Sequence, residues 1–572
     1  MSFPNKKSTV KSNKTKKNSS SFRSTAPFYS SLKTERNVCD SNLTFNECEL
    51  AILRSQSDKA KERQEKRKVN SPEIKKMISI VEQFIRYKKS IVYGGTALNN
   101  ILPENDQFYN KELEIPDYDF YSPTALDDAK ELADIFFENG FEDCEAKSGM
   151  HHGTYKVYVN FIPIADITYL SPEIYNALRK EAIDKNGILY TPVNFLRMSV
   201  YLELSRPAGD VERWNKVYDR LLLLNKHYPF NSKNCSTVEF QRGLEKDSTK
   251  GSYKEKKENE MSEKIYEITR DTFIKEGCVF FGGYAISQYS QYMPPKLRKR
   301  VQKYADFDVI SYEAKSTAEK VKEALRSSGI EDVKVIKREP VGEIIPLHYE
   351  IKVGIDTIAF VYKPIACHSY NMIETTTETG SVEKVKIATI DTMLTFYLAF
   401  LYTNRPYYNA FLDRTICMAA YLFEVQQQNR LEQKGLLKRF SINCYGHQET
   451  VEEIKAEKAR KYAELKNKKG TREYEEWFLS YQPYKKFMNV TETMTTPLNS
   501  KEQGQKEQKQ FEEKEEKSFR TKTTPTQTLA QQLGKRRNRR TKGKKRNINP
   551  YTRKKFNMKL FMNRIKSRKQ RK

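Results

Sequence analysis

Two aspartates separated by one residue, Asp117 and Asp119, stand in the alternating stretch IPDYDFYS. Side chains at i and i+2 of a β-strand point to the same face, so both carboxylates would face one way, with Tyr118 and Phe120 in the core. Two carboxylates on one face repel each other and favour a hard divalent cation such as Mg²⁺, which takes oxygen ligands. Alone, the pattern fits a solvated edge strand better.

A third carboxylate favours the metal site. Asp166 is the only acid in the mostly apolar run TYKVYVNFIPIADITYL, where an acid requires a partner. We expect this run to alternate, with one side formed by Tyr155, Val157, Val159 and Phe161. Beside the D-x-D strand, Asp166 would complete three carboxylates around two metal ions. One ion would bind a triphosphate and assist the leaving pyrophosphate, and the other would activate an attacking hydroxyl that Asp166 orients or deprotonates.

A glycine pair precedes the aspartates in SIVYGGTALNN, where a predicted strand runs into Gly94 and Gly95 and then an apolar-periodic segment. Glycines at such a turn let backbone N–H groups and a helix N-terminus face an anion. The next residue, Thr96, could donate its hydroxyl to a phosphate. Most strand–Gly–Gly turns bind nothing, so this element gains weight only beside the carboxylates.

The same features recur later in the chain. CVFFGGYAISQ matches SIVYGGTALNN, and DFDVIS, with Asp306 and Asp308, matches DYDFYS. Asp356, in GIDTIAFVY, follows Asp308 by 48 residues, and Asp166 follows Asp119 by 47 residues. Three features in the same order and spacing predict two copies of one α/β domain.

Cations for a triphosphate are offered by the segment RPAGDVERWNKVYDRLLLLNKHY. Arg213, Lys216 and Arg220 are spaced i, i+3 and i+7, so they could share one helix face. A solvated basic helix face explains the spacing equally well.

The sequence offers little support for a zinc site or for other common catalytic motifs. The eight cysteines form no C-x-x-C pair, and only Cys367 and His368 adjoin, so we expect reduced and mostly buried thiols. His151 and His152 stand in a polar loop without further ligands at metal spacing, and contact with RNA fits them better. The sequence contains no P-loop and no G-x-S-x-G.

Composition divides the 572 residues into folded and unfolded parts. We expect a mostly disordered basic arm over residues 1–70, one domain over 71–245, a polar linker over 246–260, a second domain over 261–480, and a disordered basic tail over 481–572. No apolar run of about 18 residues and no signal peptide is present, so neither a membrane span nor secretion by that route is expected.

The net charge of +28 is concentrated at the ends of the chain. Residues 1–34 hold eight Lys or Arg, residues 534–572 hold nineteen, and neither segment contains an acid. The part between them is close to neutral. Basic arms of this kind suit polyanions, above all nucleic acid, although a localisation signal or a solubilising tail is an alternative.

The combination of Gly-Gly, D-x-D and a third aspartate resembles the polymerase-β-like nucleotidyltransferase superfamily. The duplication and the WNKVYDRLLLL segment are similar to the poly(A) polymerase catalytic subunits of poxviruses and giant viruses, over roughly residues 71–480. The resemblance implies an α/β (α+β) fold of tandem nucleotidyltransferase-like domains, each a mixed sheet with flanking helices. It also implies template-independent addition of adenylates from ATP to RNA 3′ ends with Mg²⁺ or Mn²⁺, by one active and one degenerate domain.

Carried onto this chain, the resemblance predicts a catalytic and metal-binding set, Asp117, Asp119 and Asp166. The predicted nucleotide-binding set is Gly94, Gly95, Thr96, Arg213, Lys216 and Arg220. We expect the first copy to be active, because the second has a bulky Tyr284 in place of Thr96 and lacks the basic row.

The same resemblance implies RNA and ATP as partners, and either a homodimer or a separate processivity subunit. It places the protein in the host cytoplasm or a viral factory, with packaging in the virion as a further expectation. Two alternatives stay open: another RNA or small-molecule nucleotidyltransferase of the same fold, and a catalytically inactive RNA-binding scaffold. The basic ends favour an RNA acceptor over a small molecule.

Overall fold

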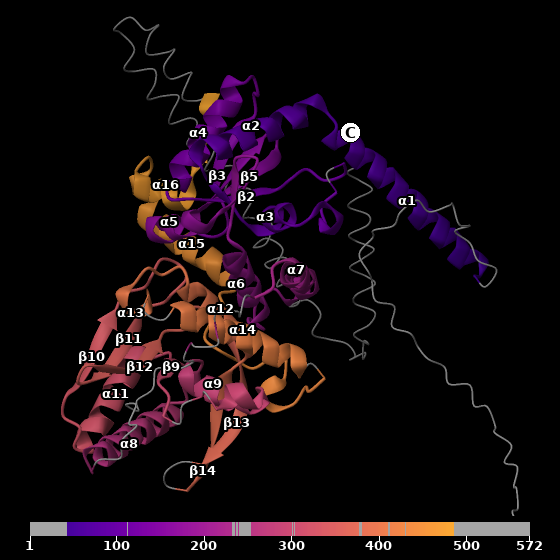
Figure 1. Ribbon diagram of the computed structural model, residues 1–572. Coiled ribbons are helices and arrows are strands. Elements are labelled where there is room, and N and C mark those ends of the chain that lie inside the picture. The colour runs from indigo at the N-terminus through magenta and orange to yellow at the C-terminus, as the bar shows by residue number, and fades with distance from the viewer. Residues whose placement is uncertain are drawn as a thin grey trace, which may run out of the picture. The chain divides into compact units, whose positions relative to one another are not determined.

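The computed structural model describes most of the chain between residues 43 and 484 (Figure 1). The described residues are 43–110, 112–230, 253–299, 304–376, 380–409, 412–429 and 431–484, with the single positions 235, 238 and 301. The basic end segments 1–34 and 534–572, which carry most of the net charge, therefore lie outside the described residues.

The first half of the chain contains one mixed sheet with flanking helices. Its elements are α1 (Phe45–Val69), α2 (Pro72–Lys88), β1 (Ile91–Val92), α3 (Gly94–Ile101), β2 (Tyr118–Ser122), α4 (Ala125–Glu138), β3 (Cys144–Ser148), β4 (Thr154–Val159), β5 (Ile162–Tyr169), α5 (Pro172–Glu181), β6 (Ile183–Lys185), β7 (Ile188–Tyr190), α6 (Val193–Leu204) and α7 (Trp214–His227).

A second mixed sheet follows. Its elements are α8 (Tyr253–Lys275), β8 (Val279–Phe280), α9 (Gly283–Tyr289), α10 (Pro295–Arg298), β9 (Phe307–Ile310), α11 (Ala314–Ser327), β10 (Val333–Arg338), β11 (His348–Val353), β12 (Asp356–Tyr362), β13 (His368–Thr376), β14 (Val382–Ala388), α12 (Ile390–Phe400), α13 (Pro406–Asn409), α14 (Leu412–Gln428) and β15 (Cys444–Tyr445). The described chain ends with α15 (Val451–Leu465), α16 (Arg472–Phe478) and β16 (Ser480–Tyr481).

The two sheets have the same strand order, which confirms the predicted duplication. The first runs β16-β3-β4-β5-β2-β1-β7-β6, and the second runs β10-β11-β12-β9-β8-β14-β13-β15. Leaving aside β16 and β15, each strand of one sheet has a counterpart at the same place in the other. In both, a short strand before the glycine pair lies antiparallel to the D-x-D strand, which in turn lies parallel to the next strand.

Local sequence signals place the helix before the first sheet. Ser71 caps α2 by accepting a hydrogen bond from the backbone N–H of Ile74, and Pro72 occupies the first turn. Apolar residues at helical spacing then bury one face of α2, from Ile74 to Ile85.

The expected disorder of residues 1–70 is wrong for the part that the structure describes. Residues 45–69 form α1, which begins with a capping box in which Thr44 and Glu47 satisfy each other's backbone N–H groups. The helix exposes nearly all its residues and buries only Val69, so the sequence shows no apolar stripe by which to predict it. The predicted linker also ends early, because α8 begins at Tyr253.

The run expected to form one alternating strand is a hairpin. β4 ends at Val159, Asn160 and Phe161 both have positive φ, and β5 begins at Ile162. Phe161 is 83% exposed and therefore does not share the buried face of β4. The turn places Asp166 on a separate strand, which pairs with both β4 and β2.

The end of the described chain returns to the first sheet, which corrects the boundary expected at residue 480. β16 pairs antiparallel with β3. Ion pairs add to this contact, since Lys130 Nζ lies 2.6 Å from Glu475 and Arg472 lies 3.1 Å from Asp127. Residues of α16 and β16 therefore stabilise the first copy, although they follow the second in sequence.

The expectation of reduced thiols is wrong for two cysteine pairs. Disulfides join Cys235 to Cys417 and Cys367 to Cys444, across sequence separations of 182 and 77 residues. Such separations carry no sequence signal, because only the fold brings these residues together. Cys144 and Cys278 are free and buried, as expected.

Helices α6 and α12, which occupy equivalent places in the two copies, pack against each other. This contact carries buried side chains of α6 such as Tyr201 into the same apolar core as Leu394 and Leu398 of α12. Within the described part of the chain, no helix combines the length and the apolar composition that a membrane span requires.

Two buried histidines of the second copy predict a loss of stability in acid. Burial lowers the pKa of His348 to about 4 and that of His368 to about 3. An unfolded histidine takes up its proton near 6.5, so stability is full above that pH and declines as the pH falls toward 4. For His348 alone, the free energy of unfolding should be about 2 kcal/mol lower at pH 5 than at pH 7.5.

Chemical denaturation of the full chain across this pH range measures the effect. His348→Asn should flatten the pH dependence of the free energy of unfolding, because asparagine does not titrate in this range. Its amide can still donate the hydrogen bond that Nδ1 of His348 makes to the Pro346 carbonyl over 2.9 Å, so the variant should fold. The matched control is His447→Asn at an exposed position, which should leave the slope unchanged. A slope that His348→Asn does not alter would contradict the prediction.

Candidate active site

The three predicted carboxylates lie together at one edge of β2 and β5. The two strands are parallel neighbours (Figure 1). Their register places Asp119 directly opposite Asp166. Asp117 stands immediately before β2, two residues from Asp119, while the intervening Tyr118 and the following Phe120 are buried. The side chains of this strand therefore alternate as predicted, with apolar residues in the core and carboxylates on the other face.

Desolvation and mutual repulsion raise the pKa values of two of these carboxylates. Desolvation in the cleft, followed by the charge of Asp166, raises the pKa of Asp117. Desolvation together with the charges of Asp117 and Asp166 raises the pKa of Asp119 to about 7. Both shifts have the same origin, because negative charge is crowded where little water can screen it.

Lys156, on β4, supplies one positive charge beside this group. It lies directly opposite Asp166 in the β4–β5 register, and its Nζ donates to the Asp166 carboxylate. Partial burial opposes the charged form, but the ion pair with Asp166 outweighs it and raises the pKa of Lys156. Lys156 was not predicted as a site residue, because a lysine on the polar face of a strand resembles a solvated side chain.

The glycine turn lies against the carboxylates. Gly94 has φ +68°, and a Cβ at this position would stand 2.9 Å from Oδ2 of Asp119. A Cβ on Gly95 would clash with the Tyr109 hydroxyl and lie 3.1 Å from an Arg220 nitrogen. Both glycines are thus required by close approach, and α3 begins directly at this turn.

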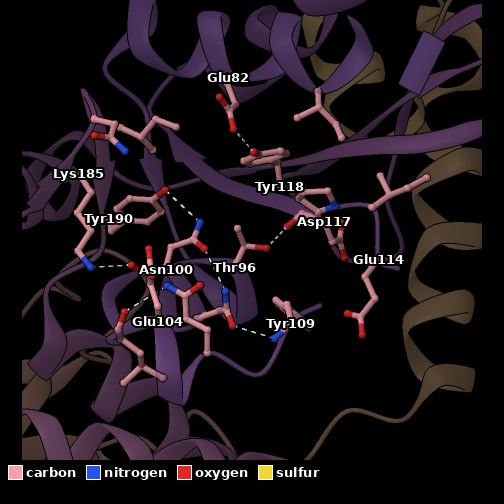
Figure 2. A pocket seen from close by; sticks show the side chains of 18 of the residues that line it. Glu82, Thr96, Asn100, Glu104, Tyr109, Glu114, Asp117, Tyr118, Lys185 and Tyr190 are labelled. Carbon is pink, nitrogen blue, oxygen red and sulfur yellow. Dashed lines mark hydrogen bonds between the residues drawn. The ribbon is translucent and has the colours of Figure 1, made fainter. Parts of the chain in front are cut away.

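Thr96 is hydrogen-bonded to the protein backbone. Its hydroxyl donates to the backbone carbonyl of Asp117 over 2.6 Å, as Figure 2 shows, and the residue is buried. The hydroxyl therefore ties α3 to the start of the D-x-D strand, while contact of Thr96 with a nucleotide stays a prediction. The side chain also lines a cavity of about 710 Å³ whose lining includes Asp117 and Tyr109 (Figure 2).

The basic row reaches the same site from α7 and from the residue immediately before it. Arg213, Lys216 and Arg220 line a cavity of about 390 Å³ whose lining also includes Asp117 and Asp119. The other lining residues are Tyr93, Gly94, Gly95, Leu98, Tyr109, Tyr121, Thr191, Phe195, Leu196, Ser199, Val200, Glu203 and Val217. The lining of this cavity thus combines two carboxylates, the glycine backbone and three cations.

Neighbouring side chains hold two of these cations in place. A guanidinium nitrogen of Arg220 donates to the Tyr109 hydroxyl over 3.0 Å, and the guanidinium stacks 4.9 Å from the Phe108 ring centre. Nε of Arg213 lies 3.4 Å from the Glu203 carboxylate. Sequence reasoning missed Tyr109 and Glu203, since the first stands in a long connection and the second in an apolar helix, neither with a recognisable motif.

The donor set fits a hard divalent cation. Asp117, Asp119 and Asp166 offer only carboxylate oxygens, and desolvation together with neighbouring negative charge raises the pKa of Asp117 and Asp119. Among the described residues, however, no three His, Cys, Asp or Glu side chains are already arranged around a common point. Binding would therefore require the carboxylates to turn toward the ion, including release of Asp166 from Lys156.

The second copy lacks a comparable carboxylate group, which corrects the equivalence expected for Asp356. In the β9–β12 register, Phe360 stands opposite Asp308, where the first copy has Asp166 opposite Asp119. Asp356 is the first residue of β12, pairs with Val353 across a hairpin and is exposed. Equal spacing in sequence therefore did not mean equal position.

The glycine turn of the second copy also lies against its aspartates, but the residue after the glycine pair differs. A Cβ on Gly282 would clash with the Asp308 side chain, and one on Gly283 with Asp306. Tyr284, at the place of Thr96, is buried with its ring centre 4.7 Å from that of Phe280. These contacts support the expectation that the first copy holds the working site.

The duplicated mixed sheets, with Gly-Gly turns facing D-x-D strands, form a tandem nucleotidyltransferase-like fold. A crystal structure of the Megavirus polyadenylate synthase shares this fold, with a TM-score of 0.62 and 20% identity over 82% of this chain and 92% of that one. Residues 79–210 match a family model described as poly(A) polymerase catalytic subunit. The matched segment contains both glycines and all three carboxylates of the first copy, and it ends before the basic row.

Two viral relatives align with part of the chain, and both are named "Putative poly(A) polymerase catalytic subunit". The protein of Acanthamoeba polyphaga mimivirus is 33% identical over 159 residues, which cover 27% of this chain and 26% of that protein. The protein of African swine fever virus (strain Badajoz 1971 Vero-adapted) is 33% identical over 171 residues, covering 29% and 36%. The aligned segments thus span about a quarter to a third of these relatives, and the resemblance predicted from the sequence is confirmed over that range.

Proposed function

We propose that this protein is a template-independent polynucleotide adenylyltransferase that transfers AMP from ATP to the 3′ ends of RNA. The observation that carries the proposal is the pairing of Asp119 with Asp166 across β2 and β5, beside Asp117 and facing the Gly94 turn. The matching family model and the viral relatives support adenylate transfer over other reactions of this fold.

The glycine backbone and the basic side chains would have different roles in such a transfer. The Gly94–Gly95 backbone at the start of α3 would receive the triphosphate, because both glycines line the cavity that also contains the carboxylates and the cations. Arg213, Lys216 and Arg220, which line the same cavity, would neutralise the phosphates. Catalysis would then rest mainly on positioning and charge neutralisation.

Two divalent cations, Mg²⁺ or Mn²⁺, would be held by Asp117, Asp119 and Asp166. When bound, they supply Lewis-acid stabilisation of the triphosphate and of the leaving pyrophosphate, and a lowered pKa of the attacking 3′-hydroxyl. Asp166, at the β4 side of the group, would orient that hydroxyl. Tyr93 would help to hold β2 and β5 in place, since its hydroxyl lies 2.9 Å from the Thr168 hydroxyl and its ring stacks on Tyr121.

Other features stay predictions. The basic ends of the chain would retain RNA between additions, and either a second copy of the chain or a separate subunit would serve processivity. The host cytoplasm or a viral factory stays the predicted place of action.

Primer extension tests the proposal. The full chain is incubated with a short labelled RNA, one nucleoside triphosphate at a time, and Mg²⁺ or Mn²⁺. Extension with ATP well above that with CTP, GTP or UTP is expected. Equal use of another triphosphate would indicate a different nucleotidyltransferase, and RNA binding without extension would indicate an inactive scaffold.

A further inference from the structure

A row of charged side chains crosses three strands of the first sheet. Lys156 on β4 stands opposite Asp166 on β5, and Asp166 stands opposite Asp119 on β2. Residues opposite one another in neighbouring strands project to the same face. The ammonium of Lys156 therefore lies on the carboxylate face and is joined to Asp166 in an ion pair.

The row does not recur in the second copy, where the same register carries other residues. Glu350 on β11 stands opposite Phe360 on β12, which stands opposite Asp308 on β9. Glu350 is buried and pairs with Arg338. The lysine and the third carboxylate thus occur together in one copy, and both are missing in the other.

The ion pair is unlike the exposed pairs elsewhere on the chain. The Asp166 side chain is 18% exposed and that of Lys156 36%, so water screens their interaction only partly. The next lysine along the row, Lys147, is opposite Lys156 but pairs with Glu145, and its side chain is 48% exposed. Of these two lysines, only Lys156 occupies a carboxylate that the proposed metal site requires.

We propose that Lys156 is a positioning residue that acts as an exchangeable counter-ion, holding Asp166 in the carboxylate row until a divalent cation displaces it. The inference rests on the proposed function, because it concerns the same carboxylates. The ammonium neutralises part of the crowded negative charge, so the row stays formed without metal. It also competes with the metal for Asp166, so a cation must replace the lysine to complete the site.

The exchange predicts that removing Lys156 increases the affinity for a divalent cation, which a purely structural role does not predict. Removing the ammonium takes a positive charge away from the metal site and frees Asp166, so the affinity for a divalent cation should rise, by about tenfold. If Lys156 only supported the fold, its removal would leave metal affinity unchanged or lower it.

The test is a titration of the full chain with Mn²⁺ alone, in which electron paramagnetic resonance measures free Mn²⁺. Lys156→Met should bind Mn²⁺ about tenfold more tightly than the natural chain. Lys156→Arg, which keeps the charge, should bind like the natural chain. Lys147→Met, one strand further from Asp166, should change the affinity much less. In primer extension, the Mn²⁺ concentration for half-maximal rate should fall in Lys156→Met by the same factor.

Asp166→Asn separates the possible outcomes. It should weaken Mn²⁺ binding, and in the double variant it should remove the gain produced by Lys156→Met. Unchanged or weaker Mn²⁺ binding by a folded Lys156→Met chain would overturn the inference while leaving the proposed function standing. Absence of any Mn²⁺ binding that depends on Asp166 would overturn both the inference and the metal site of the proposed function.

Discussion

Replacing both Asp117 and Asp119 with asparagine should reduce AMP incorporation into RNA by at least about a thousandfold. The change removes two of the three carboxylates that would hold the metal ions, and metal-ion stabilisation of such a transition state contributes several kcal/mol, where each 1.4 kcal/mol is about tenfold in rate. Asparagine has nearly the same shape, so the fold should survive. Single-turnover primer extension with saturating ATP and RNA measures the loss.

The matched control is Asp308→Asn in the second copy. Asp308 occupies the same place against its glycine turn as Asp119 does in the first copy. Because Phe360 stands opposite it, no third carboxylate is present there, and AMP incorporation should stay within about threefold of the natural rate. Equal losses from the two copies would show that both sites contribute, and a loss confined to Asp308→Asn would reverse the assignment.

The second large effect is expected from Gly94→Ala. The new Cβ would stand 2.9 Å from Oδ2 of Asp119 and would push that carboxylate away from Asp166. A displacement of about 1 Å at a reacting centre can cost roughly a hundredfold in rate. The positive φ of Gly94 adds about 1–2 kcal/mol of backbone strain, which lowers stability.

Gly140→Ala separates the strain from the collision. Gly140 also has a positive φ, but a Cβ there would have no neighbour within 4 Å. Both variants should therefore lose similar stability in denaturant titrations, while only Gly94→Ala should lose about a hundredfold in kcat. Similar activity in the two variants would mean that Gly94 does not position Asp119.

The sequence predicts most of what local pattern controls. A period of two placed Asp117 and Asp119 on the face opposite Phe120, and the lone acid of an apolar run was Asp166. The repeated motifs predicted two copies of one domain, which the strand orders confirm. These features are predictable because each depends on residues within a few positions of one another, or on a motif that occurs twice.

Features that depend on register between strands were not predictable. Residue counting made Asp356 the equivalent of Asp166, but the hairpin before β12 is placed differently and leaves Phe360 opposite Asp308. Lys156 owes its contact to the same kind of register. The return of β16 to the first sheet involves a strand of only two residues, which has no periodicity to detect.

Thr96 illustrates a different limit. A hydroxyl beside a glycine turn can serve either a ligand or the backbone, and the sequence does not distinguish the two. In the structure it donates to Asp117, so its contribution to the site would be to hold the start of the carboxylate strand. Tyr284 cannot make that bond at the equivalent place, and this difference between the copies still points to the first as the working one.

If adenylate transfer takes place where Asp166 faces Asp119, it should depend on Asp166 and not on Asp356. AMP incorporation into an RNA primer is measured for Asp166→Asn and for Asp356→Asn, the two residues that equal spacing in sequence would make equivalent. The structure predicts a loss of at least about a hundredfold for Asp166→Asn. For the exposed Asp356→Asn it predicts a rate close to that of the natural chain. Full activity in Asp166→Asn, or a comparable loss in Asp356→Asn, would contradict the account.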